Sequence, residues 1–171
     1  IMQLGIFSIA FAIVNYKEKG IMKRLFAAPL KSTDFILSQV FTRLIISVIQ
    51  ISILIAVARI FFDLKIIGNY LILLVLVIMG SVLFLCFGFA LGGFAKTQDA
   101  AAAIANIFVF PQMFLGNVFF PLESMPVWLQ KIVVYLPLNY LADGIRQVAT
   151  QAATWSSLQK DFIGLIIFVI L

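Results

Sequence analysis

Histidine is absent from the sequence, and cysteine occurs once, at Cys86. Without histidine the chain lacks the commonest metal ligand and the side chain that most often acts as a general base near neutral pH. A single cysteine cannot form a disulfide within the chain. Charged residues are also scarce, at 11% of the chain, against roughly a quarter in soluble domains. These shortages argue against a histidine-dependent enzyme and against a disulfide-stabilised secreted domain.

Enzyme and nucleotide-binding motifs are missing as well. The sequence contains no C-x-x-C, H-E-x-x-H or G-x-S-x-G pattern. The stretch 92–97 superficially resembles a phosphate-binding loop, but it lacks both the Gly-Lys-Ser/Thr step and a preceding strand. None of the seven acidic residues lies in the middle of an apolar run. We therefore predict no catalytic residue, no metal site and no cofactor bound by this chain.

Apolar residues are abundant, at 64% of the 171 residues. A soluble domain of this size buries only about 70% of the surface of its unfolded chain, so it cannot hide so much apolar area from water. Long runs with few charges predict transmembrane helices, because a lone span in lipid must satisfy its own backbone hydrogen bonds. The predicted spans are 1–16, 35–62, 70–95, 100–119 and 158–171.

The predicted fold class is an all-α, polytopic membrane helical bundle. No repeat and no Gly/Ser-rich or Pro-rich linker divides the chain, so residues 1–171 are interpreted as a single transmembrane domain. The sequence begins and ends inside apolar runs, and its last run is shorter than the roughly 20 residues that a span needs. We interpret it as a fragment of a longer multi-pass protein of the cell membrane (the cytoplasmic or inner membrane).

Positive charge is concentrated in segment 17–34. The net charge of +5 could indicate nucleic-acid binding, but the excess lies between two apolar runs, so we predict a membrane-flanking loop and no nucleic-acid partner. The positive-inside rule places this loop in the cytoplasm. Segments 63–69 and 120–157 are then outside, and the turn 96–99 is inside. The cations of the loop are Lys17, Lys19, Lys23, Arg24 and Lys31.

The segment Tyr16–Pro29 predicts a short amphipathic helix along the cytoplasmic face. Apolar residues recur on one side of it, and Pro29 prevents a smooth continuation into the next span. Two interpretations stay open from the pattern alone. The helix lies at the interface, where its cations meet anionic lipid, or it is a docking element for a cytoplasmic partner.

Arg43 lies about two turns into the second apolar run. A charge at mid-bilayer costs roughly 2.5–3.5 kcal/mol on insertion scales, whereas a long side chain near the end of a span can reach the headgroups. A snorkelling role and a pairing role inside the bundle both stay open.

Three prolines exclude a single straight helix in the region Phe119–Tyr140. Pro121, Pro126 and Pro137 divide it, so we predict two short helices that are re-entrant or interfacial. We expect Pro137 to end the first and Asn139 to cap the second. The aromatic residues suited to the headgroup level are Trp128, Tyr135 and Tyr140.

Two spans carry further features. The fourth contains Asn106, Pro111 and Gln112, which predict either interhelical packing or a place on the substrate path, with a kink at Pro111. The third contains Gly88 and Gly92 as a G-x-x-x-G pair, which permits close helix contact.

Two stretches resemble the membrane subunit of ABC-2 type exporters. E-K-G-x-x-K-R-L-x-x-x-P, from Glu18 to Pro29, is similar to the cytoplasmic coupling-helix segment of that family. F-F-P-L-E-x-x-P-x-W-L-Q, followed by L-P-L-N-Y-L-A-D-G-I-R, is similar to its extracellular re-entrant region. Ile21 stands where threonine is usual and Asn117 where glycine is usual, so the resemblance does not specify a subfamily.

The resemblance implies a permease that moves substrate outward with energy from a partner. It implies an ABC ATP-binding subunit or domain holding ATP and Mg, a second permease copy (identical or different) and contact with membrane lipid. An ATP-independent channel or secondary transporter is the alternative, and it would more often carry acidic groups at mid-membrane. The implied coupling residues are Glu18, Gly20, Lys23, Arg24, Leu25 and Phe26. Those of the re-entrant region are Pro121, Glu123, Pro126, Trp128 and Pro137.

Overall fold

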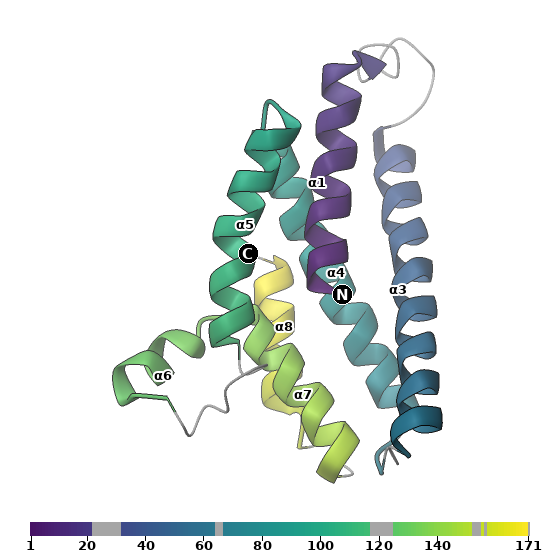
Figure 1. Cartoon of the computed structure of the whole chain (residues 1–171), viewed down its shortest axis with the longest axis vertical. Coiled ribbons are helices and arrows are strands. Elements are labelled where there is room, and N and C mark those ends of the chain that lie inside the picture. The colour runs from purple at the N-terminus through teal and green to yellow at the C-terminus, as the bar shows by residue number, and fades with distance from the viewer. Residues whose placement is uncertain (22–31, 64–66, 117–124, 152–154, 156, 171) are drawn as a thin grey trace. The chain divides into compact units, whose positions relative to one another are not determined.

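The computed structural model describes residues 1–21, 32–63, 67–116, 125–151, 155 and 157–170 (Figure 1). Throughout this part of the chain the regular secondary structure is helical, as the apolar runs predicted. The helices are α1 (Met2–Glu18), α3 (Ser32–Phe62), α4 (Tyr70–Phe94), α5 (Gln98–Leu115), α6 (Val127–Val133), α7 (Pro137–Gln151) and α8 (Gln159–Ile170).

Two of these helices are long and apolar enough to cross a membrane. They cover 33–61 in α3 and 70–94 in α4, with mean hydropathies of 2.5 and 2.9. Neither contains a proline, so the backbone bonding of each continues through the whole run. After α3, Asp63 has a φ of 48°, a left-handed conformation that ends the helix and that aspartate tolerates better than most residues.

The remaining predicted spans are also helical where they are described. Helices α1, α5 and α8 have 17, 18 and 12 residues. They overlap the runs 1–16, 100–119 and 158–171, and residues 117–119 and 171 lie outside the described part. That these three helices cross the membrane remains a prediction.

The chain divides into two compact units, each assembled from segments that are distant in sequence. The first combines Ile1–Ser47 with Ser81–Val109, and the second combines Val48–Gly80 with Phe110–Leu171. Helices α3, α4 and α5 each contribute residues to both units.

In the first unit, α1 packs closely against the second half of α4. A Cβ built on Gly88 would lie 2.8 Å from the carbonyl oxygen of Gly5 and 2.9 Å from that of Ile6. A Cβ on Gly92 would lie 3.0 Å from the Cα of Ala10. The two glycines therefore let the backbones approach, as the G-x-x-x-G spacing predicted.

Helix α3 contributes to the same unit through its first half. The rings of Tyr16 and Phe35 meet edge to face, with centroids 5.4 Å apart. Arg43 donates from Nη2 to the carbonyl oxygen of Ser8 at 3.2 Å, while its Nε is buried without a hydrogen-bond partner. Arg43 thus engages α1, although its partner is a backbone carbonyl and not a carboxylate.

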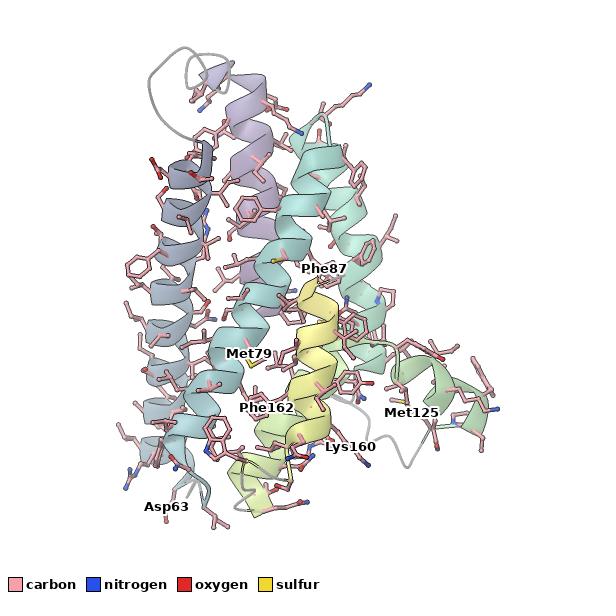
Figure 2. All side chains as sticks on the ribbon, turned by 180° about the vertical axis from the view of Figure 1, so that it is seen from behind. Asp63, Met79, Phe87, Met125, Lys160 and Phe162 are labelled. Carbon is pink, nitrogen blue, oxygen red and sulfur yellow. The ribbon has the colours of Figure 1, made fainter. Side chains whose placement is uncertain are left out.

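The second unit contains α6, α7 and α8. Helices α7 and α8 pack against each other where Gly164 makes room: a Cβ there would lie 2.7 Å from Cδ1 of Tyr140. The Nε2 of Gln147 donates to Asp143 at 3.0 Å and to Asp161, on α8, at 3.2 Å. Figure 2 shows Phe162 at the start of α8, where it stacks on Trp155 with ring centroids 5.4 Å apart.

The two short helices predicted around the prolines are present, with different ends. Helix α6 stops at Val133, and Pro137 begins α7 instead of ending the preceding helix. Proline is well suited to a first helical position, because the N–H that it lacks would be unpaired there. The predicted cap at Asn139 is wrong: it lies inside the first turn of α7, and its Oδ1 is buried without a partner.

Candidate functional site

The junction at the end of α1 is where the predicted coupling segment begins. Helix α1 ends at Glu18, and Gly20 follows with a φ of +64°. The N–H of Gly20 donates to the carbonyl of Lys17 at 3.1 Å, which closes the last turn. Glycine adopts this left-handed conformation without the steric cost that a Cβ adds. Gly20 therefore sets the direction in which the chain leaves α1.

Lys17, in the last turn of α1, binds the carboxyl end of α4. Its Nζ donates to the carbonyls of Gly92 at 2.8 Å, Gly93 at 2.6 Å and Ala95 at 3.4 Å. The last carbonyls of a helix have no partner within the helix and form the negative end of its dipole. Helix α4 has no basic residue in its own last turn, so Lys17 supplies the missing cation.

Glu18, the next residue, binds the amino end of α5. Its Oε1 accepts the N–H of Gln98, the first residue of α5, at 3.3 Å. The Oγ1 of Thr97 accepts the N–H of Ala100 at 3.2 Å and completes the start of this helix. A carboxylate is favourable there because the first N–H groups of a helix lack partners and carry partial positive charge.

The two side chains therefore bind the two ends of the α4–α5 turn, residues 95–97. Buried beneath them is a small apolar cluster from α1, the turn and α5, made of Ala10, Val14, Ala95 and Ala101. Figure 1 shows the carboxyl end of α1 and the turn into α5 at the same end of the first unit. Lys17 was not among the predicted coupling residues. The one available signal was the absence of a cation at the end of α4.

The structure describes only some of the predicted site residues. Glu18 and Gly20 lie at the junction above, and Glu18 faces the backbone of α5. The residues that lie outside the described part are Lys23, Arg24, Leu25 and Phe26 of the coupling segment and Pro121 and Glu123 of the re-entrant region. Their roles remain predictions.

The described aromatic residues of the re-entrant region differ in exposure. Trp128 on α6 is 64% exposed and Tyr135 is 77% exposed, so both are available to lipid headgroups. Tyr140 instead packs on Gly164 and lies 6.2 Å from the ring of Phe168 on α8. Pro126 directly precedes α6, near Met125, which Figure 2 labels. Trp128 and Tyr135 are thus exposed and Tyr140 is packed against α8, while the interfacial position of all three rings remains a prediction.

The three predicted substrate-path residues all lie on α5, and their role remains a prediction. Asn106 belongs to the first unit and is half-buried, whereas Pro111 and Gln112 belong to the second. Gln112 is only 3% exposed, and its Oε1 is buried without a hydrogen-bond partner. An apolar cleft in the second unit, between α3 and α4, is lined by residues such as Ile51, Ile55 and Leu74 and by none of these three.

Comparison with known proteins identifies relatives. A family model described as ABC-2 type transporter matches residues 1–149. The chain is 22% identical over 153 residues to the "Probable multidrug ABC transporter permease YbhR" of Escherichia coli (strain K12), covering 87% of this chain and 42% of that protein. It is 22% identical over 152 residues to the "Linearmycin resistance permease protein LnrN" of Bacillus subtilis (strain 168), covering 89% and 39%.

This chain covers a smaller share of one eukaryotic relative. The chain is 21% identical over 145 residues to "ABC transporter G family member 20" of Dictyostelium discoideum, covering 85% of this chain and 20% of that protein. No solved structure matches. The chain thus spans less than half the length of each of these relatives. Because the family model covers most of its residues, the chain belongs to the ABC-2 type transporter family and is a membrane transport component.

Proposed function

We propose that this chain is part of the permease of an ATP-driven exporter. The permease moves substrate outward across the cell membrane, and a separate subunit or domain hydrolyses ATP with Mg. The observation that carries this proposal is the junction at the end of α1. There Gly20 has a positive φ just before the cationic segment 22–31 in the sequence, and Lys17 and Glu18 bind the end of α1 to α4 and α5.

Segment 22–31 is proposed as the contact with the ATPase. Lys23 and Arg24 would meet acidic groups in a groove of the partner, and Leu25 and Phe26 would supply apolar contact area. Cation and apolar contacts in one short helix combine orientation with affinity. A second permease copy completes the transport unit, since the family resemblance implies paired membrane subunits.

Helices α6 and α7 are proposed as the extracellular re-entrant pair. The exposed rings of Trp128 and Tyr135 support this position, because indole and phenol rings favour the membrane–water interface. Asn106, Pro111 and Gln112 are proposed to border the substrate path. The names of two relatives refer to multidrug transport and to linearmycin resistance, so a panel of apolar drugs is the first substrate set to test.

A secondary transporter is the rival function, and one contact favours it. Asp143 and Asp161 share the amide of Gln147, and Asp161 is only 5% exposed. Buried acidic groups in membrane proteins often couple ion movement to transport. A secondary transporter of this kind would move substrate without ATP and would lose transport in the Asp161→Asn variant.

Binding of an ATPase tests the first proposal directly. The full-length permease, with a purification tag, is used to capture a Walker-motif ATPase from detergent-solubilised membranes. We expect Arg24→Glu and Leu25→Asp each to reduce capture about tenfold, because loss of a central contact costs 1–2 kcal/mol or more. Lys19→Glu, an exposed change outside the proposed contact residues, is the matched control.

Transport in proteoliposomes completes this test. Uptake of drug into inside-out vesicles should require both ATP and the ATPase. If uptake proceeds without any ATPase, and the two variants behave like the control, the exporter proposal is wrong.

A further inference from the structure

Two adjacent side chains of opposite charge bind the two ends of one turn. Lys17 reaches three carbonyls at the end of α4, and Glu18 reaches the first N–H of α5. The contacts are 75 to 80 residues apart in sequence. We refer to this pair and its four hydrogen bonds as the Lys17–Glu18 clasp.

Each charge matches the helix end that it binds. The carbonyls at the end of α4 attract a cation, and the free N–H groups at the start of α5 attract an anion. Hydrogen bonds in which one partner is ionised are also stronger than neutral ones. Exchanging the two side chains would reverse both matches. The order Lys-Glu therefore matches a turn that connects the carboxyl end of one helix to the amino end of the next.

The clasp changes the role expected of Glu18. Its resemblance to a coupling motif implied contact with the ATPase, but its Oε1 is directed at the backbone of Gln98 within the chain. Gly20 begins the turn into segment 22–31 only two residues later. Lys17 and Glu18 thus come shortly before the proposed docking segment in the sequence, and they contact two helices that are distant in the sequence.

We propose that Lys17 and Glu18 are positioning residues that fix the α4–α5 turn to the end of α1, from which the chain continues into the coupling segment. A displacement of that segment by the ATPase then reaches α4 and α5 through the clasp, as well as α1 and α3 through the chain. The apolar cluster beneath the turn keeps the ends of α1 and α5 together during this movement. The inference rests on the proposed function. It adds Lys17 and Glu18 as residues that transmit the movement of the ATPase to α4 and α5.

The first measurement is transport per ATP hydrolysed, made on the full-length permease with its ATPase in proteoliposomes. Lys17→Met keeps a long apolar stem but removes the ammonium, and Glu18→Ala removes the acceptor. We expect each to lower the ratio of drug transported to ATP hydrolysed by about fivefold, at the low end of measured coupling between sites. Capture of the ATPase should stay at the wild-type level.

Conservative variants separate positioning from general damage. Lys17→Arg retains a cation, and Glu18→Gln retains an oxygen that can accept the N–H of Gln98, so both should restore most of the ratio. Lys19→Met is the matched control, because Lys19 is exposed and follows the clasp directly. If Glu18→Ala abolishes capture of the ATPase, Glu18 contacts the partner and the proposal fails for that residue.

The second measurement does not depend on an ATPase. Hydrogen–deuterium exchange of the permease alone, in nanodiscs, is followed in the peptide that contains residues 94–101. Lys17→Met and Glu18→Ala should speed exchange there, whereas Lys19→Met should not. Unchanged exchange overturns the clasp whether or not an ATPase partner exists. Faster exchange with an unchanged transport ratio shows that the contacts are only structural and also overturns the proposal.

Discussion

At the scale of single residues, the positive φ of Gly20 leads to a specific prediction about substitutions at this position. Its φ of +64° places any other residue in a strained conformation, although, among the described residues other than its chain neighbours, none has an atom within 4 Å of a Cβ built there. Gly20→Ala should destabilise the end of α1 by about 1 kcal/mol, and Gly20→Asn by less, because asparagine tolerates this region. Thermal unfolding in detergent measures the change. Gly93→Ala is the control, since Gly93 also has open space but no positive φ; equal effects would contradict the argument.

Residue contacts also mark the limits of what the sequence could predict. The sequence predicted the helix that forms α5 and the motif that contains Glu18. It did not predict the hydrogen bond that joins them. Lys17 lies 75 residues from the first carbonyl that it binds, and no local pattern encodes such a contact. Asn139 was predicted as a cap from its residue type alone, and the proline two positions before it started the helix earlier.

At the scale of elements, the contact between α1 and α4 should be intolerant of added atoms. A Cβ on Gly88 would lie under 3 Å from two backbone carbonyl oxygens, which cannot turn aside as a side chain would. Gly88→Ala should therefore cost about 1–3 kcal/mol, the usual range for overpacking. Gly93→Ala on the same helix again serves as control. Loss of monodisperse protein on size-exclusion chromatography, or a lowered melting temperature, reports the change; an unaffected Gly88→Ala variant would contradict this packing.

The helix boundaries in the structure agree with those predicted from the sequence where composition alone determines them. The apolar runs at 35–62 and 70–95 became α3 and α4 within a few residues, because long apolar segments without proline have few alternatives to a helix in lipid. The region 119–140 was harder, since short helices depend on turns and neighbours. There the pair of helices was predicted, but the end of α6 and the start of α7 were not.

At the scale of the whole molecule, the exposed apolar face of α3 should need lipid. Ile49 is 53% exposed near the middle of this helix, and Ile60 is 76% exposed near its end. Ile49→Lys should disfavour insertion by roughly 2.5–3.5 kcal/mol, while Ile60→Lys should cost much less because its side chain can reach the headgroups. A glycosylation-based insertion assay measures both. Equal penalties would show that α3 does not cross the membrane at this depth.

Topology is a second property of the whole molecule. In a variant with Cys86→Ser, single cysteines at positions 23 and 130 should react with a membrane-impermeant reagent from opposite sides. The cationic segment 17–34 favours the cytoplasm and the region around α6 the exterior. Modification of both positions from one side would overturn the predicted orientation.

The two compact units were not predicted from the sequence, because the boundary between them passes through three continuous helices.

The tight approach of α1 and α4 restricts how cargo can pass. With Gly5 and Gly88 leaving only backbone between them, the two helices cannot slide past each other by small steps without collision. Densely packed surfaces of this kind switch as blocks and do not deform gradually. In the proposed transport cycle, we therefore expect α1 and the second half of α4 to move together as one rigid body. On that proposal, an opening for substrate would form along the other faces of these two helices.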